Sequence, residues 1–564
     1  MIFTPYFPGH PPAKPVPRHF RLAIFARVVL LPLLLSLGTI VSLGSYYETN
    51  DEGTLTWLFS GVLALKPVPS VPLYLHGYGH LLAAAYTVLP KVPWLGLLLA
   101  GLLGGATVLL FAVLDRLLRP YLRAVPLALV LVLFFGMAWA EHWLWFSHAR
   151  VGLLLAGAAV LYAAQRWRSR RALLLGLAGL GAAWLLRPSV AVLGFGAVLP
   201  AALLLAGSWR RAAPVLLGGG LLLALATGAA AVFRTPAEAR TQAQDGYFAR
   251  ILDFDQLQPA PRTPADSLAT AAIGSWLLGD STVVNEALGR RAYRFDAADF
   301  WGRTVPAKVA LRAGMLVRDS FPLLLALAAT AVVLRRRTIR HQWFWPVQLS
   351  FGGLLMLFAG VLKLPPRIAQ PLLLFWLLTN LALLLATPVA GFIRRRGPRW
   401  NPLLVAIAAL AGLLYGAKTL HRRQVLGQER SRHERALAEI SQRTGGRIRV
   451  LAGTSDLLKS LSPFRVYTVG TGSVLLLSGW SAHDPSQPAL WQALVGTRDQ
   501  ATCLRRLAAP GRQVQWLLSA ETARWLNRRL RYRPGTEARV VLEPGPVLAA
   551  DTTLRFYRPA QLRR

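Results

Sequence analysis

The sequence predicts an all-α polytopic membrane domain followed by a smaller soluble α/β domain. Of the 564 residues, 54% are hydrophobic and only 16% are charged, which is more apolar surface than a soluble domain can bury. Long apolar runs recur as far as residue 417, and short β-rich runs alternate with helical stretches after it. We therefore divide the chain into a tail at 1–21, a membrane domain at 22–417 and a soluble domain at 418–564.

The formal charge of +38, from 63 Lys+Arg against 25 Asp+Glu, suggests an anionic partner. Nucleic acid is disfavoured, because much of the arginine sits in short clusters between apolar runs. Such clusters set membrane topology, and anionic lipid head groups are a sufficient partner for them. Cys503 is the only cysteine, which excludes an intramolecular disulfide and a cysteine-based metal cluster.

About eleven membrane spans are predicted. The Pro-rich, basic tail at 1–21 precedes the first, Leu22–Leu43, whose apolar part is too long for a signal peptide and lacks a clear cleavage site. Several later runs are shorter than the ~20 residues of an upright span, so their ends are approximate. The later runs lie near 94–114, 124–140, 151–164, 172–186, 189–206, 214–232, 314–334, 343–361, 366–387 and 401–417.

The segment 71–89 decides the topology. With His76, His80, Tyr74, Tyr78 and two glycines it is typical of an interfacial helix. If it does not cross and the N-terminus is cytoplasmic, all five basic clusters fall inside, as the positive-inside rule requires. The outer face then receives 45–93, 233–313 and 418–564. The five clusters are Arg116/Arg119/Arg123, Arg166/Arg168/Arg170/Arg171, Arg210/Arg211, Arg335/Arg336/Arg337/Arg340 and Arg394/Arg395/Arg396/Arg399.

Two of these outer segments have predicted structure of their own. The loop 233–313 is long for a connection, shows helical periodicity near 283–295, and carries Asp245 and Arg250, which is typical of a lid or a binding segment. The C-terminal part begins with a charged helix at 418–444 and has another helix at 520–531. Its predicted strands are Arg447–Ala452, Val474–Ser478, Val514–Ser519, Ala538–Leu542 and Thr553–Tyr557.

The acidic triplet Asn50-Asp51-Glu52 follows the first span within the aromatic stretch that begins at Tyr46-Tyr47. Asn and Asp are favoured helix N-caps, and acids suit the first turn of a helix, so a purely structural role is a strong alternative. Two carboxylates just beyond a membrane boundary are also placed where partial burial tunes their pKa values. Asp51 is therefore the predicted chemical centre, with Glu52 as its helper.

Cations in short outer turns form a second predicted set. Arg187, Lys363 and Arg367 lie where the positive-inside rule disfavours positive charge, so they suit a lipid-linked phosphate or pyrophosphate. His148 and Arg150 lie in the outer turn 141–150. The tryptophans of that turn, Trp143 and Trp145, are better explained as interface anchors.

Metal, transport and ATPase chemistry receive little support. His76 and His80, four residues apart, have the spacing of a helical metal pair, but such a pair more often faces the membrane interface. The predicted spans hold almost no ionisable residue near their centres, which disfavours an ion-coupled transporter. The sequence has no Walker-type phosphate loop and no His-Glu-x-x-His helix.

The chain resembles the membrane glycosyltransferases of the C-type fold (GT-C), the group of protein O-mannosyltransferases and aminoarabinose transferases, and within it uncharacterised bacterial multi-pass proteins. The likeness covers most of the chain, but its motifs are short. The soluble domain and the context of the acidic pair depart from the better-known members. The motifs are Asn50-Asp51-Glu52, Leu58-Phe59-Ser60-Gly61, the Pro-rich 67–72, Leu89-Pro90-Lys91-Val92-Pro93-Trp94, Leu186-Arg187-Pro188 and Leu477-Ser478-Gly479-Trp480.

The resemblance implies an inverting transfer of a sugar from a polyprenyl-phosphate donor on the outer face of a bacterial cytoplasmic membrane. Asp51 matches the family's acidic residue in the first outer loop, and would act as general base or hold the acceptor and a divalent metal ion in place. From placement, we assign phosphate binding to Arg150, Arg187, Lys363 and Arg367. The residues assigned to substrate binding are Asn50, His76, His80, His148, Asp245 and Arg250.

The acceptor, a glycan, a lipid or a protein of the cell envelope, is left open. Two other functions remain as alternatives. One is a non-catalytic transport or assembly protein of the envelope, in which Asp51 and Glu52 cap a helix and the soluble domain binds a partner. The other is a polymer ligase that uses a lipid pyrophosphate. If the protein is either kind of enzyme, Asp51 and the outer cations should converge in one cavity open to the bilayer. If it is the non-catalytic protein, they should lie scattered.

Overall fold

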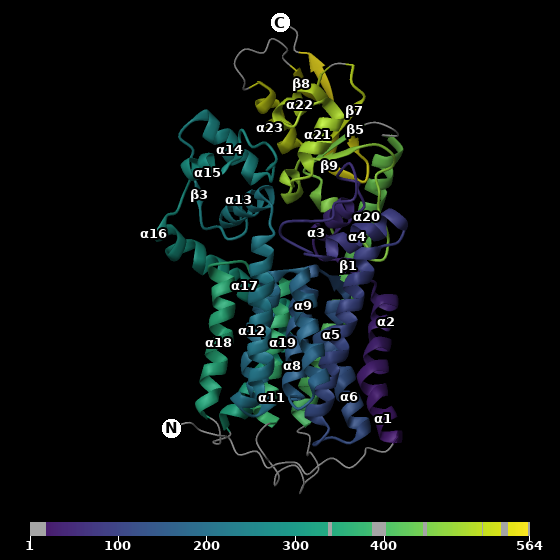
Figure 1. Cartoon of the computed structure of the whole chain (residues 1–564), viewed down its shortest axis with the longest axis vertical. Coiled ribbons are helices and arrows are strands. Elements are labelled where there is room, and N and C mark those ends of the chain that lie inside the picture. Colours follow the sequence, from purple (N-terminus) through teal and green to yellow (C-terminus); the bar gives the residue numbers. More distant parts are fainter. Residues whose placement is uncertain are drawn as a thin grey trace.

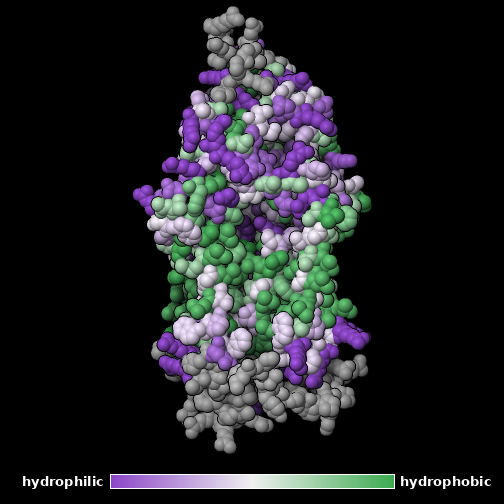
Figure 2. All heavy atoms as spheres, turned by 60° about the vertical axis from the view of Figure 1, so that its left-hand side comes forward, coloured by the Kyte–Doolittle hydropathy of each residue, from purple (hydrophilic) through white to green (hydrophobic). Residues whose placement is uncertain are grey.

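The computed structural model describes residues 18–336, 341–385, 402–443, 448–509, 511–531 and 540–561. A bundle of helices stands upright below a cap that contains further helices and a sheet (Figure 1). An apolar band covers the bundle, whereas hydrophilic residues cover the cap and a rim at the opposite end (Figure 2). On the face shown in Figure 2, a hollow opens where the cap meets the band. We call the end of the bundle that bears the cap the domain end.

Seven of the described helical segments are long and apolar enough to cross a membrane, and α10 with α11, bent by 46°, would add an eighth. The prediction of a polytopic membrane protein is therefore confirmed, while eleven spans remain a prediction. The bundle contains α1 (Arg18–Phe25), η1 (Ala26–Leu30), α2 (Leu31–Leu43), α5 (Trp94–Leu118), α6 (Ala124–Phe134), η2 (Phe135–Trp139), α7 (Ala140–Leu144), α8 (His148–Gln165), α9 (Arg170–Leu186), α10 (Pro188–Ala197), α11 (Leu199–Ala206), α12 (Trp209–Val232), α17 (Val305–Arg336), α18 (His341–Gly360) and α19 (Pro366–Leu385).

Helix α8 is the core of the bundle. It is apolar on all sides, nearly every residue is buried, and it packs closely against α5, α9, α10 and α19. A helix without a polar face is stable only when neighbours surround it. Its 18 residues and the 17 of α9 are fewer than the ~20 of an upright span.

The segment 71–89 does not run through the bundle. Its helix α4 (Tyr78–Val88) has only 11 residues and lies beside α3 (Asp51–Phe59) at the domain end (Figure 1). The described basic clusters flank the other ends of the helices, for example Arg116 in the last turn of α5 and Arg335 in the last turn of α17. Arg337, Arg340 and the cluster at 394–399 lie outside the described residues.

The predicted loop 233–313 is a helical lobe in the cap. Two of its helices begin with capping boxes, in which Thr235 pairs with Glu238 and Thr263 pairs with Asp266, so the sequence sets these starts locally. The lobe contains α13 (Pro236–Leu252), β3 (Gln258–Pro259), α14 (Pro264–Gly274), α15 (Glu286–Ala292), β4 (Tyr293–Arg294), α16 (Ala297–Asp299) and η3 (Phe300–Thr304). Strands β3 and β4 pair antiparallel.

The C-terminal part forms a five-stranded sheet in the order β6-β5-β7-β9-β8. Strands β6, β5 and β7 are parallel, and β9 pairs antiparallel with both β7 and β8. Strands and helices fall close to the predicted positions, and β7 and α23 match them residue for residue. The elements are β5 (Ile448–Ala452), η5 (Ser455–Leu458), β6 (Val474–Leu476), η6 (Trp480–His483), α21 (Gln487–Val495), α22 (Gln500–Leu507), β7 (Val514–Ser519), α23 (Ala520–Arg531), β8 (Val540–Leu548) and β9 (Asp551–Gln561).

Helix α20 (Pro402–Arg443) joins bundle and cap as one rod of 42 residues. We expected a span at 401–417 and a separate charged helix at 418–444, whereas the described residues form a single helix across that boundary. The lobe and the sheet share a second hydrophobic core. Buried Arg529 of α23 pairs with Asp280 of the lobe at 2.7 Å, and the Trp525 indole donates to the Leu268 carbonyl. The lobe and the C-terminal domain are therefore one packed unit.

Candidate functional site

The stretch before α3 is fixed against the domain end of α7. Gly44 ends α2 with φ of +82°, a left-handed conformation that glycine adopts without strain. Strand β1 (Tyr46–Tyr47) then pairs in parallel with β2 (Trp145–Phe146), and the Ser45 hydroxyl donates to the Trp143 carbonyl. The first two residues of α3 are consequently Asp51 and Glu52, held at the border between bundle and cap.

Glu52 is fully buried and paired with α8. Its Oε1 accepts the backbone N–H of His148 at 3.0 Å and lies 2.8 Å from the Nδ1 of the same residue. The Thr49 hydroxyl donates to the other carboxylate oxygen at 2.9 Å. Burial alone would raise the pKa of Glu52, but the hydrogen bond and charge of His148 outweigh it and lower the pKa. Glu52 is therefore an ionised, positioned carboxylate.

Asp51 is only half-buried and faces the C-terminal domain. Its Oδ1 accepts the indole N–H of Trp480 at 3.0 Å, and Thr49 donates to Oδ2 at 3.3 Å. Asn50 occupies the N-cap position of α3 but makes no side-chain capping bond. The two carboxylates thus bond to residues from distant parts of the chain, which is not the arrangement that a purely capping role predicts.

Arg187 approaches this acidic pair from α9. It is the last residue before Pro188 starts α10, and its guanidinium lies 4.9 Å from the centre of the Tyr74 ring and 3.5 Å from His148 Nε2. The Tyr74 ring lies 4.8 Å from that of His148 and 5.5 Å from that of Trp480. Burial raises the pKa of Tyr74. Arg187 forms no ion pair with a carboxylate among the described residues.

The loop that carries Tyr74 is strained. Leu75 has φ of +55°, which is rare for a residue with a side chain, and its N–H donates to the Leu186 carbonyl at the end of α9. Strained backbone of this kind clusters at functional sites. The hydrogen bond fixes Tyr74 beside Arg187.

Arg367 is the second cation of the site. It is half-buried in the first turn of α19, within electrostatic range of Glu48, Asp51 and Glu52, but without an ion pair among the described residues. A positive charge in the first turn opposes the helix dipole, so this position is unfavourable for a purely structural arginine. Arg187 and Arg367 therefore lie near the carboxylates and are both available to an anion.

The lobe adds Asp245 to the site. The Asp245 carboxylate lies 2.6 Å from His483 Nε2, and it is near enough to Tyr74 to influence its pKa. The neighbouring Asp484 is buried, and burial raises its pKa, with a smaller contribution from the Asp245 charge. Because Trp480 and His483 both belong to η6, this short segment of the C-terminal domain contacts the acidic pair and the lobe at once.

Other predicted residues are paired with groups other than Asp51, although Asp253, the partner of Lys363, is near enough to Tyr74 to influence its pKa. Lys363 is paired with Asp253 at 2.5 Å, and exposed Arg250 donates to Gln256 at 3.2 Å. His76 and His80 line a separate cavity of about 370 Å³, together with Trp184, Phe233 and Arg234. Burial there lowers the pKa of His76, as does the Arg234 charge. No three His, Cys, Asp or Glu residues form a possible metal site in the described part of the chain.

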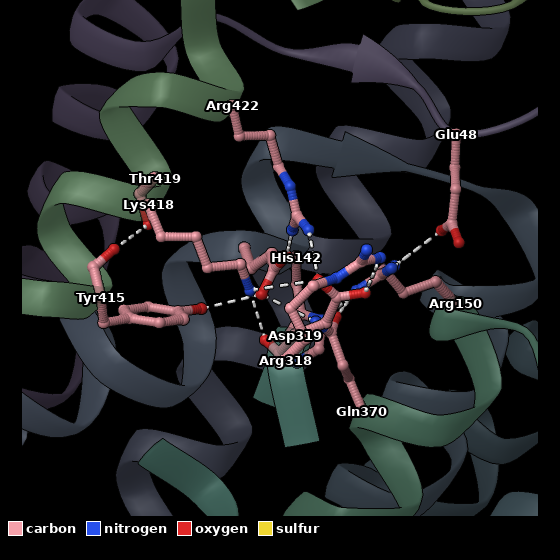
Figure 3. Close-up of polar contacts among 11 residues, drawn as sticks. Glu48, His142, Arg150, Arg318, Asp319, Gln370, Tyr415, Lys418, Thr419 and Arg422 are labelled. Carbon is pink, nitrogen blue, oxygen red and sulfur yellow. Dashed lines mark hydrogen bonds and ion pairs between the residues drawn. The ribbon is translucent and has the colours of Figure 1, made fainter. Parts of the chain in front are cut away.

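Arg150 belongs to a buried chain of charges that sequence reasoning missed (Figure 3). It is fully buried, pairs with Glu48 at 2.8 Å, and also contacts His142 and Gln370. Because all these partners are protein groups, its predicted phosphate-binding role has no support here. The chain continues as Gln370 to Glu141, Glu141 to Tyr415 and Arg422, Arg422 to Asp319, and Asp319 to Lys418.

No signal in the sequence indicated these pairings. Glu48 and Arg150 are 102 residues apart, and Gln370 and Glu141 are 229 apart. The tryptophan that contacts Asp51 appeared only as part of a motif of the resemblance. No protein-family model, curated protein or solved structure matches this chain.

Proposed function

We propose that the protein transfers a sugar from a polyprenyl-phosphate donor to an envelope acceptor at the domain end of the bundle, with Asp51 as general base. The observation that carries this proposal is the convergence of Asp51, Arg187 and Arg367. A half-buried carboxylate and two cations without acidic partners meet at a membrane boundary, and a lipid-linked phosphate is the ligand that needs this set. The domain end would then be extracytoplasmic, in a bacterial cytoplasmic membrane.

The two adjacent carboxylates have different tasks in this proposal. Glu52 is fully buried and bonded to His148, so it cannot reach a substrate and serves to position α3 against α8. Asp51 is accessible, and its two hydrogen bonds leave lone pairs free for an acceptor hydroxyl. Asp51 is therefore the residue that meets the reacting atoms.

The reaction balances without a further reactant. The acceptor hydroxyl gives its proton to Asp51 while its oxygen attacks the anomeric carbon from the face opposite the phosphate. The bond between the anomeric carbon and the phosphate oxygen breaks, which inverts the configuration and releases polyprenyl phosphate. Arg187 and Arg367 stabilise the negative charge that develops on the leaving phosphate. The proton on Asp51 returns to water. An additional divalent ion is not needed for this balance.

The test is a transfer assay with the purified full chain in lipid vesicles and polyprenyl-phosphate sugars as donors, read out as release of polyprenyl phosphate. We expect Asp51→Asn to lower the rate by at least about 10²-fold, the usual contribution of a general base. Asp456→Asn is the matched control, because Asp456 is an exposed carboxylate of the same domain end. Equal rates for the wild type and Asp51→Asn would refute the assignment.

A further inference from the structure

A groove apart from the Asp51 site lies at the domain end, between the end of α2 and the middle of α20. Its cavity has about 740 Å³, which is within the usual range of small-molecule sites. Tyr46 forms part of the wall, while Tyr47, the next residue of the strand, lies in the main core. The groove is therefore separated from Glu48 and Asp51 by β1. It is lined by Ile40, Val41, Ser42, Leu43, Gly44, Tyr46, Arg423, Gln424, Gly427, Gln428, Arg430, Ser431 and Arg435.

The polar wall of the groove is positive. It includes Arg423, Arg430 and Arg435, and none of the described residues that line it is acidic. Arg423 is exposed and forms no ion pair among the described residues, and Arg435 donates only to the Ser431 carbonyl. Arg430 lies over the Tyr46 ring at 5.3 Å and is 4.0 Å from Glu434. Most of this positive charge is thus uncompensated by the protein.

The acids of this part of α20 point to the C-terminal domain instead. Glu429 accepts a hydrogen bond from Ser460, and Glu434 accepts one from Tyr467. The helix therefore separates its charges, with carboxylates toward the cap and arginines toward the groove. Such a separation favours an anionic occupant on the arginine side.

The opposite wall is the apolar end of α2. Val41 is 77% exposed and Leu37 is 56% exposed, and both belong to a helix that qualifies as a membrane span. The apolar surface continues from the groove down the side of the bundle through Leu34. An occupant that touches both walls needs an anionic group at the level of the arginines and a hydrocarbon chain along α2.

We propose that this groove binds the phosphate of an anionic membrane phospholipid, with the acyl chains lying against α2. Three arginines with an adjoining apolar face match the two parts of such a lipid, and each cation near an anionic membrane surface contributes favourably to binding. A free phosphate would use only one of the two walls. This site is distinct from the Asp51 site and does not depend on the proposed transfer reaction.

The chain supplies its own comparison surface. Another cavity, of about 720 Å³, lies in the cap and is also lined by three arginines, Arg262, Arg528 and Arg531. Its described walls come from α14 with the residues before it and from α23, and none of them belongs to a membrane helix. Removing the three charges there changes the net charge of the protein by the same amount as removing them from the groove. The two triple variants therefore differ in place and not in charge.

The test compares retained lipid in three purified full-length proteins: the wild type, R423Q/R430Q/R435Q and R262Q/R528Q/R531Q. Each is extracted in mild detergent, incubated with mixed micelles of phosphatidylglycerol and phosphatidylcholine, and analysed by native mass spectrometry. We expect the wild type and the cap variant to retain phosphatidylglycerol in preference to phosphatidylcholine. The groove variant should bind phosphatidylglycerol at least about tenfold more weakly, since three cations that attract an anionic head group are removed.

Three outcomes would overturn the proposal. Equal retention of phosphatidylglycerol by all three proteins would place the lipid elsewhere. Competition by glycerol 3-phosphate alone at similar concentrations would identify a soluble phosphate as the occupant. A co-purifying protein that is lost only from the groove variant would identify a protein partner. Because a triple variant can misfold, Arg423→Glu, a single change at an exposed residue, is measured beside it and should also lose the lipid.

Discussion

Neighbouring residues on one helix turn have opposite surroundings at this site. Successive side chains of an α-helix point about 100° apart, so Glu52 enters the bundle toward α8 while Asp51 faces the cap. The same turn therefore supplies a structural carboxylate and the carboxylate that we propose as the general base. Their different burial follows from helix geometry together with the position of α3 at the border between apolar and hydrophilic surroundings.

Glu52→Gln should lower the stability at neutral pH by about 3 kcal/mol, because it removes a buried carboxylate and leaves His148 without its partner. The sign of the pH dependence follows from the lowered pKa. Ionised Glu52 stabilises the fold above its ordinary pKa of 4.5, and this stability is lost as the pH falls through the native pKa. Melting temperatures in detergent from pH 7 to pH 3 measure it. A variant whose melting curve keeps the wild-type acid dependence would contradict this role.

Trp480→Phe should keep the aromatic contact with Tyr74 but remove the hydrogen bond to Asp51. In the transfer assay we expect the turnover rate to fall about tenfold with little change in KM, since a hydrogen bond to a charged group contributes about 1.5 kcal/mol or more. A change in KM alone would show that Trp480 binds substrate without positioning the base. Trp525→Phe, which also loses an indole hydrogen bond of the same domain, is the control.

At the scale of elements, the buried chain of charges fastens α20 to the bundle. Its charged members alternate in sign, and neutral Gln370 links Arg150 to Glu141. The members come from the stretch before α3, α7, α8, α17, α19 and α20 (Figure 3). Buried ion pairs are weak evidence for net stability, but removing one partner is costly because the other remains charged. We therefore expect the loss of one partner to destabilise the contact between these helices.

Arg150→Met should destabilise the protein by about 3–5 kcal/mol, because it leaves Glu48 buried and unpaired. The double variant Glu48→Gln/Arg150→Met should recover part of that loss, since no isolated charge remains. Thermal unfolding of the wild type, both single variants and the double variant forms a complete cycle. Additive losses in the double variant would show that the two side chains do not interact.

Local sequence was enough to predict several elements. The β-rich run Val514–Ser519 and the helical stretch 520–531 matched β7 and α23, and the polar residues of 71–89 marked a helix too short to cross the bundle. Of the site, the position of Asp51 and Arg187 at helix ends was predictable. Their contact with Tyr74 and Trp480 was not, because it depends on how distant segments pack.

The prediction and the structure differ more strongly at two places, the boundary at residue 417 and Arg150. The boundary at residue 417 followed a change from apolar to charged composition, whereas the backbone of α20 continues because nothing in that stretch breaks a helix. Arg150 was assigned to a phosphate ligand from its placement in an outer turn. It is buried because Glu48 compensates its charge and Gln370 accepts a hydrogen bond from it, and both come from distant parts of the chain.

On the scale of the whole molecule, the cap sits directly on the bundle. The main hydrophobic core runs from the bundle helices into strands of the C-terminal sheet, and the loop after η5 packs against α3 and α5. At Gly96 of α5, an added methyl group would overlap the Pro463 carbonyl. This close approach requires glycine and sets how near the cap lies to the membrane helices.

Gly96→Ala should loosen the cap, lower the melting temperature by several degrees and speed proteolysis of the C-terminal domain, because the loop around Pro463 has to move. Gly101→Ala on the same helix is the control, since nothing lies near its added methyl group. That variant should be neutral or more stable by up to about 1 kcal/mol, from improved helix propensity. Equal melting temperatures and equal proteolysis of the two variants would show that the close contact between Gly96 and Pro463 does not hold the cap in place.

Trp480 follows Asp51 by 429 residues, so the ribosome makes the partner of this carboxylate long after the carboxylate itself. The membrane helices can insert and pack long before that, while the acidic turn is still open on its cap side. The surroundings of Asp51 are therefore completed only after η6 has been made. A product truncated anywhere before η6 would keep the membrane helices but would lack the Trp480 hydrogen bond to Asp51.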